Sequence, residues 1–94
     1  MASPKSGKDA RKIMFTQDFL EDLEFWVSTD RKLALRILKL IDAVTRDPFE
    51  GIGKPEALKF QVGSVWSRRI NEEHRLVYEI FDDRIEFHEA RFHY

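Results

Sequence analysis

The side chains that could carry out chemistry concentrate between Gly51 and Arg75, and again at the last residues of the chain. The first stretch contains five basic residues against three acidic ones, although the whole chain of 94 residues has a net charge of -1. The basic residues are Lys54, Lys59, Arg68, Arg69 and Arg75. This local positive charge predicts a small phosphate-binding surface, since guanidinium groups hold phosphate through paired hydrogen bonds.

These residue types fit the cleavage of RNA without a metal ion. In that reaction a base takes the proton of a 2'-hydroxyl group, the oxygen attacks the adjacent phosphate, cations stabilise the developing charge, and an acid protonates the departing oxygen. Glu56 supplies a carboxylate between two lysines, and His93 supplies a group that titrates near neutrality. Arg69 and Arg75 supply cations, and Tyr94 offers an aromatic face for a nucleobase.

Each of these residues also has a simpler explanation. Glu56 could be a solvated charge on a loop, and the two arginines could form salt bridges with Glu72, Glu73 or Glu79. His93, next to the last residue, could be an ordinary surface histidine. We expect His74 to brace a hairpin and His88 to be structural or merely exposed.

Several other classes of chemistry lack the residues they need. The chain has no cysteine, so it has no disulfide, thiol nucleophile or zinc-thiolate site. Its three histidines form no His-x-His or HExxH pattern, so we expect no metal site and no cofactor. No apolar run approaches the ~20 residues of a membrane span. With 35% charged residues, the composition predicts one globular domain, residues 13–94, after a flexible leader, residues 1–12. Because neither a membrane span nor a signal-peptide pattern is present, we expect it to be cytoplasmic.

Apolar periodicity predicts the elements that position these side chains. A short strand at residues 13–15 precedes a helix at about residues 17–28, with Thr16 as its N-cap and Phe19, Leu20, Leu23, Trp26 and Val27 as its buried face. Asp30 caps a second helix, residues 31–46, and Pro48 ends it. Residues 49–63 form a loop with a single turn at residues 56–59.

Three alternating runs, residues 65–71, 75–81 and 85–92, predict an antiparallel meander. The fold class is therefore α+β, with two N-terminal helices on one face of a mainly antiparallel sheet of about four strands. If Trp66, Ile70 and Leu76 all face the helices, the first hairpin must place Arg69 beside Arg75 on the outer face.

The chain from Phe15 onward closely resembles the YoeB branch of the RelE toxin superfamily. The elements that carry the resemblance are Pro-Phe-Glu-Gly at 48–51, Gly-Lys-Pro-Glu at 53–56, Trp-Ser-Arg-Arg-Ile at 66–70, Glu-Glu-His-Arg-Leu-Val-Tyr at 72–78 and the final Tyr94. Such toxins are small ribosome-dependent endoribonucleases with a RelE-like, microbial-RNase-like fold. A partner antitoxin neutralises them.

The resemblance implies a role for each candidate residue. Glu56 matches the general base, Arg75 the residue that stabilises the transition state, His93 the general acid and Tyr94 the residue that orients the codon. The positions of Lys59, Arg69 and Glu73 match others that line this site. Ala57 departs from the family, which often has proline there, so Glu56 could be held less firmly.

The predicted function is a toxin that cuts mRNA in the ribosomal A site. Its partners would be mRNA on the ribosome, ribosomal RNA, an antitoxin of the YefM type and possibly a second copy of the chain. The alternative is a non-catalytic RNA-binding or ribosome-binding module that uses the same basic face. A DNA-binding regulator has no helix-turn-helix pattern to support it.

Overall fold

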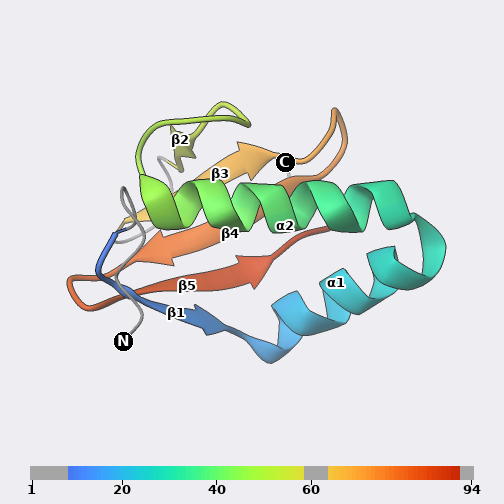
Figure 1. Cartoon of the computed structure of the whole chain (residues 1–94), viewed down its shortest axis with the longest axis horizontal. Helices are drawn as coiled ribbons and strands as arrows, with labels where there is room; N and C mark the ends of the chain where they lie inside the picture. The colour runs from blue at the N-terminus through green and yellow to red at the C-terminus, as the bar shows by residue number, and fades with distance from the viewer. Residues whose placement is uncertain (1–8, 59–63, 92–94) are drawn as a thin grey trace, which may run out of the picture.

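The computed structural model describes residues 9–58 and 64–91 as two helices packed on one face of a mixed sheet (Figure 1). The helices are α1 (Gln17–Thr29) and α2 (Arg31–Arg46). The strands are β1 (Lys12–Phe15), β2 (Glu56–Ala57), β3 (Val65–Arg69), β4 (Arg75–Ile80) and β5 (Arg84–Glu89). Neither described helix combines the length and the apolar character needed to cross a bilayer.

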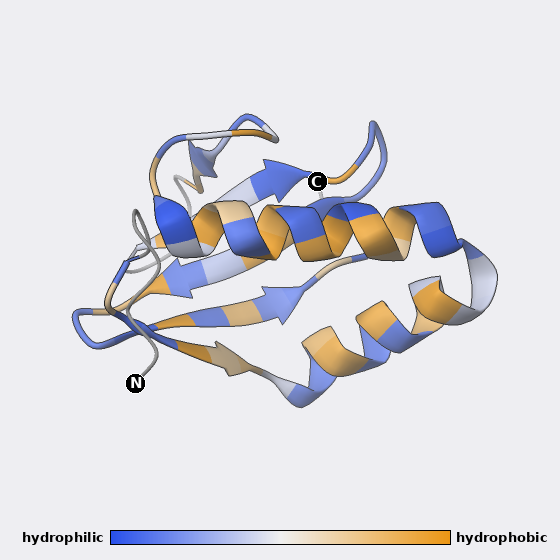
Figure 2. Ribbon diagram, in the orientation of Figure 1, coloured by the Kyte–Doolittle hydropathy of each residue, from blue (hydrophilic) through white to orange (hydrophobic). Residues whose placement is uncertain are grey.

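Local capping fixes where both helices begin, as predicted. The Thr16 hydroxyl accepts a hydrogen bond from the Phe19 amide at 3.1 Å, and the Asp30 carboxylate accepts one from the Leu33 amide at 3.3 Å. These bonds satisfy amide groups that the first turn of a helix leaves without a partner. Apolar and polar residues alternate along both helices (Figure 2), so each presents an apolar stripe to the sheet.

The core lies between this stripe and the inner face of the sheet. Its fully buried large apolar side chains are Phe19, Ile37, Leu40, Val44, Leu76, Tyr78, Ile85 and Phe87. On α1 the contact is one narrow row, in which Leu23 joins Phe19 and Trp26. The prediction was wrong for Leu20 and Val27, which flank this row and are 44% and 53% exposed.

The sheet has five strands in the order β1-β5-β4-β3-β2. All neighbours are antiparallel except β1 and β5, which are parallel. The prediction of about four strands missed β2, which pairs with β3 where we expected a single turn. Residues 9–12, assigned to the leader, include the start of β1, and the Arg11 guanidinium donates to the Phe81 carbonyl at 2.7 Å. Residues 1–8 lie outside the described residues.

The β3–β4 hairpin has the predicted register. Arg69 pairs with Arg75, and the Ile70 amide donates to the His74 carbonyl at 2.9 Å. The Asn71 side chain accepts from the amides of Glu73 and His74 and so shapes the connecting loop. Arg69 and Arg75 therefore lie side by side at one end of the outer face.

Candidate active site

Glu56 stands on the edge strand of the sheet, at the end of the glycine-containing loop. The loop backbone has positive φ at Gly53 (+85°), where an added Cβ would lie 2.8 Å from the Leu40 side chain. The Gly53 carbonyl accepts from the Arg69 amide at 2.6 Å, which ties the loop to β3. Glu56 then pairs with Ser67, so its strand pairing holds it next to the central strands.

Three side chains from three adjacent strands meet on the outer face. The Arg75 guanidinium lies 3.5 Å from the Glu56 carboxylate and donates to the Ser67 hydroxyl at 3.3 Å. Ser67 is fully buried, whereas the Glu56 side chain is 64% exposed. The carboxylate is thus held beside a cation and remains open to a large ligand. The salt bridges that the sequence suggested for Arg75 did not include this pairing with Glu56.

Three further predicted residues neighbour this group along the chain or across the sheet. Arg69 is exposed next to Arg75, and Lys54 is exposed in the loop that precedes Glu56. Glu73 is exposed in the β3–β4 loop. Arg69 therefore adds a second guanidinium beside Arg75, and Glu73 adds a negative charge two residues before Arg75 in the chain.

Arg68 faces the other side of the sheet, which corrects its predicted place among the RNA-binding residues. Its side chain is fully buried and donates to the Tyr78 hydroxyl at 3.1 Å. It also donates to the carbonyls of Asp47, Glu50 and Ile52. A guanidinium enclosed in this way has no surface to offer RNA. Burial raises the pKa of Tyr78, and the hydrogen bond from Arg68 lowers it in part.

Lys59, His93 and Tyr94 lie outside the described residues. The chain that leads to the last two is well anchored. The Trp26 indole donates to the Ala90 carbonyl at 2.7 Å, and the Ala90 amide donates to the Asp22 carboxylate at 2.9 Å. Near this point Glu89 pairs with Val77, two residues after Arg75 on β4. The end of β5 thus runs alongside the start of β4.

His74 has the bracing role that the sequence predicted. It is buried, and its ring meets the Trp26 ring edge-on with 4.6 Å between centroids. Its amide and carbonyl both hold the hairpin loop.

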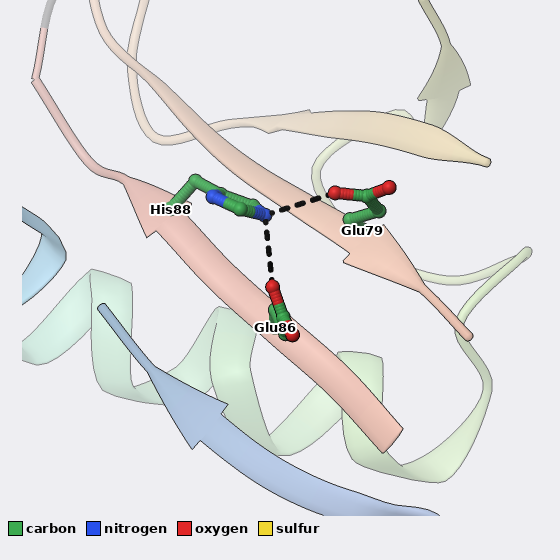
Figure 3. Close-up of side chains that lie close together, drawn as sticks. All are labelled: Glu79, Glu86 and His88. Atoms are coloured by element: carbon green, nitrogen blue, oxygen red, sulfur yellow. Dashed lines mark ion pairs between the residues drawn. The ribbon is translucent and has the colours of Figure 1, made fainter. Parts of the chain in front are cut away.

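A second cluster was not predicted. Glu79 and Glu86 pair across β4 and β5, and His88 joins them on the same face (Figure 3). The sequence alone could place two of the three side chains together, because Glu86 and His88 are two residues apart and so share one face of a strand. The β4–β5 register brings Glu79 opposite Glu86.

Comparisons with known proteins define the class and then the family. Residues 15–94 match the YoeB-like toxin of bacterial type II toxin-antitoxin systems. Toxin RelK of Mycobacterium tuberculosis is 51% identical over 84 residues, which cover 89% of this chain and 99% of that protein.

Two solved structures from Staphylococcus aureus share the fold. The YoeB dimer aligns with a TM-score of 0.82 at 38% identity, covering 90% of this chain and 99% of that chain. A YoeB-YefM complex aligns with a TM-score of 0.77 at 38% identity, covering 89% and 98%. The fold is thus that of RelE-type toxins, as archaeal RelE in its RelE-RelB complex also shows. The chain belongs to the YoeB-like toxin family of type II toxin-antitoxin systems, as the resemblance implied.

Proposed function

We propose that this toxin is an endoribonuclease that cuts mRNA in the ribosomal A site without a metal ion. The observation that carries the proposal is the position of the exposed Glu56 carboxylate, 3.5 Å from the Arg75 guanidinium on one sheet face. A base and a cation at this separation can contact the two ends of one reacting group, the 2'-hydroxyl and the phosphate beside it.

The positions of Glu56 and Arg75 support their roles in the proposed reaction, and the roles of Lys59 and His93 are those that the family resemblance implies. Glu56 takes the proton of the 2'-hydroxyl, and the oxygen attacks the neighbouring phosphorus. Arg75, with Arg69 and Lys59, stabilises the negative charge of the pentavalent phosphorane. His93 donates a proton to the departing 5'-oxygen, which leaves a 2',3'-cyclic phosphate and a 5'-hydroxyl.

Substrate positioning falls to the remaining residues and to the ribosome. Tyr94 stacks against a nucleobase and orients the codon, while Lys54 and Glu73 line the site. The net charge of the whole chain is only -1. A nuclease that held free RNA by itself would need a larger basic surface, so we propose that the ribosome holds the mRNA in place for cleavage.

The test is to map 5' ends of cellular transcripts after induction of the wild-type chain and of Arg75→Ala and His93→Gln. We expect cuts within translated codons for the wild type and their loss in both variants, with soluble protein at equal levels. Cuts that persist in both variants would refute the catalytic assignment. If even the wild type binds ribosomes without cutting, the alternative of a non-catalytic RNA-binding or ribosome-binding module would take its place.

We also propose that a YefM-type antitoxin restrains this toxin. The basic residues around Arg75 suit an acidic antitoxin segment that folds on binding and displaces His93 and Tyr94. An apolar groove between α2 and the following loop, lined in part by the exposed side chains of Leu35, Leu38 and Ile52, supports a protein partner as well. Co-expression of the antitoxin should relieve growth arrest, and the two chains should purify together. A toxin that stays fully active beside its antitoxin would exclude this pairing.

A further inference from the structure

We propose that Glu79, Glu86 and His88 form a binding site for one Zn²⁺ or similar divalent cation on the outer face of β4 and β5. This inference stands apart from the RNA chemistry, because it uses none of the residues placed in that site. Imidazole nitrogen and carboxylate oxygen together are ligands that Zn²⁺ binds readily.

The spacing of the three side chains fits a shared ion. The His88 Nε2 atom lies 3.2 Å from a Glu79 oxygen and 3.6 Å from a Glu86 oxygen (Figure 3). The three ligand atoms all lie within 4.8 Å of one another. Zinc bonds of about 2.0–2.2 Å in a tetrahedron place neighbouring ligand atoms about 3.3–3.6 Å apart. The two distances from His88 therefore approximate the edges of a zinc tetrahedron, whose fourth position would stay open to water or another ligand.

The environment of His88 gives an independent indication. Its Nε2 atom is shielded from solvent and, among the described residues, makes no hydrogen bond of acceptable geometry. A buried nitrogen without a hydrogen bond is costly, and a cation between it and the two carboxylates would satisfy it. The ion would also relieve the repulsion between Glu79 and Glu86, which are directly opposite each other.

Two features of the fold position the ligands. The register of β4 and β5 shifts between Val77 and Tyr78. Val77 pairs with Glu89 and Tyr78 pairs with Phe87, so His88 has no pairing partner on β4. Such a bulge re-aims a side chain. The second feature is Arg84, whose Nε atom donates to the Glu86 Oε2 atom at 2.7 Å, while the Glu86 Oε1 atom faces His88. Arg84 thus orients this carboxylate, as outer partners of metal ligands commonly do.

The rival explanation is a protonated His88 that bridges the two carboxylates with no metal. Zinc titration of the full chain, purified without a histidine tag and in competition with a chelating dye, separates the two. We expect the wild type to bind one Zn²⁺ per chain, and His88→Gln and Glu79→Gln each to weaken binding at least about tenfold. Glu72→Gln is the matched control, because it removes the same charge from an exposed loop position and should leave zinc affinity unchanged.

Thermal unfolding of the metal-free variants verifies that each is folded before its titration. If the wild type binds no zinc, or if His88→Gln and Glu79→Gln bind as tightly as the control, the site does not exist. Loss of binding on His93→Gln with full binding by His88→Gln would place the ion elsewhere and overturn the proposal equally.

Discussion

Arg68 and Arg69 are adjacent in the sequence, yet the structure predicts opposite consequences when each is replaced by methionine. Arg68 donates four hydrogen bonds from a fully buried side chain, three of them to carbonyls in residues 47–52. Arg69 is exposed on the outer face. Arg68→Met should therefore destabilise the fold, whereas Arg69→Met should leave it nearly unchanged.

The magnitude follows from what the methionine leaves behind. A buried polar group without a partner costs about 1–3 kcal/mol, but the loop carbonyls can turn partly toward water, and removing the guanidinium also removes the cost of burying its charge. We therefore expect a loss of about 3 kcal/mol in the free energy of unfolding, a large share of the about 5–15 kcal/mol typical of a domain. An exposed substitution such as Arg69→Met should change it by no more than about 0.5 kcal/mol.

Urea unfolding followed by tryptophan fluorescence measures this difference. With a denaturant slope of about 2 kcal/mol per molar, Arg68→Met should unfold at a midpoint about 1.5 M below the wild type. The midpoint of Arg69→Met should coincide with that of the wild type. Equal midpoints for all three proteins would refute the conclusion that Arg68 is a buried structural cation.

Three further substitutions test other parts of the fold. Because burial raises the pKa of Tyr78, its hydroxyl should contribute stability below the unfolded-chain pKa of about 10, and this contribution should fade as pH rises through the folded pKa. Tyr78→Phe should abolish the corresponding fall in urea midpoint above about pH 9, and a fall that persists would contradict the assignment. Gly53→Ala should lower the free energy of unfolding by about 1–2 kcal/mol, since its φ is +85° and the new Cβ would meet Leu40; an unchanged melting temperature would argue against this loop geometry. Trp26→Phe removes the hydrogen bond to the Ala90 carbonyl and should speed amide exchange at the end of β5, whereas unaltered exchange would show that the indole does not anchor it.

Local chemistry in the sequence accounts for much of the fold. Thr16 and Asp30 correctly predicted the starts of the two helices, because a capping oxygen acts within three residues of its own position. The Arg69–Arg75 pairing was predictable because burial of the neighbouring apolar side chains permits only one register. What these features share is a cause that lies within one element or one hairpin.

The remaining features depend on contacts between distant segments. Strand alternation places Arg68 on the same face as Trp66 and Ile70, which indicates that it points toward the helices. Its hydrogen-bond partners in residues 47–52 become visible only when that loop folds against β3 and β4. The parallel pairing of β1 with β5 joins the two ends of the domain, which no local pattern specifies. The bulge that frees His88 from β4 is likewise a property of two strands together.

The assignment of Glu56 as the base of an RNA-cleaving site is tested most directly by the single-turnover cleavage rate of mRNA on programmed ribosomes. The matched pair is Glu56→Gln and Glu50→Gln. Each removes one exposed carboxylate, but only the Glu56 carboxylate forms the ion pair with Arg75. We predict that Glu56→Gln lowers the rate by about 10²–10⁴-fold, as expected for the loss of a general base, and that Glu50→Gln cuts at the wild-type rate. Equal rates for the two variants would contradict the account.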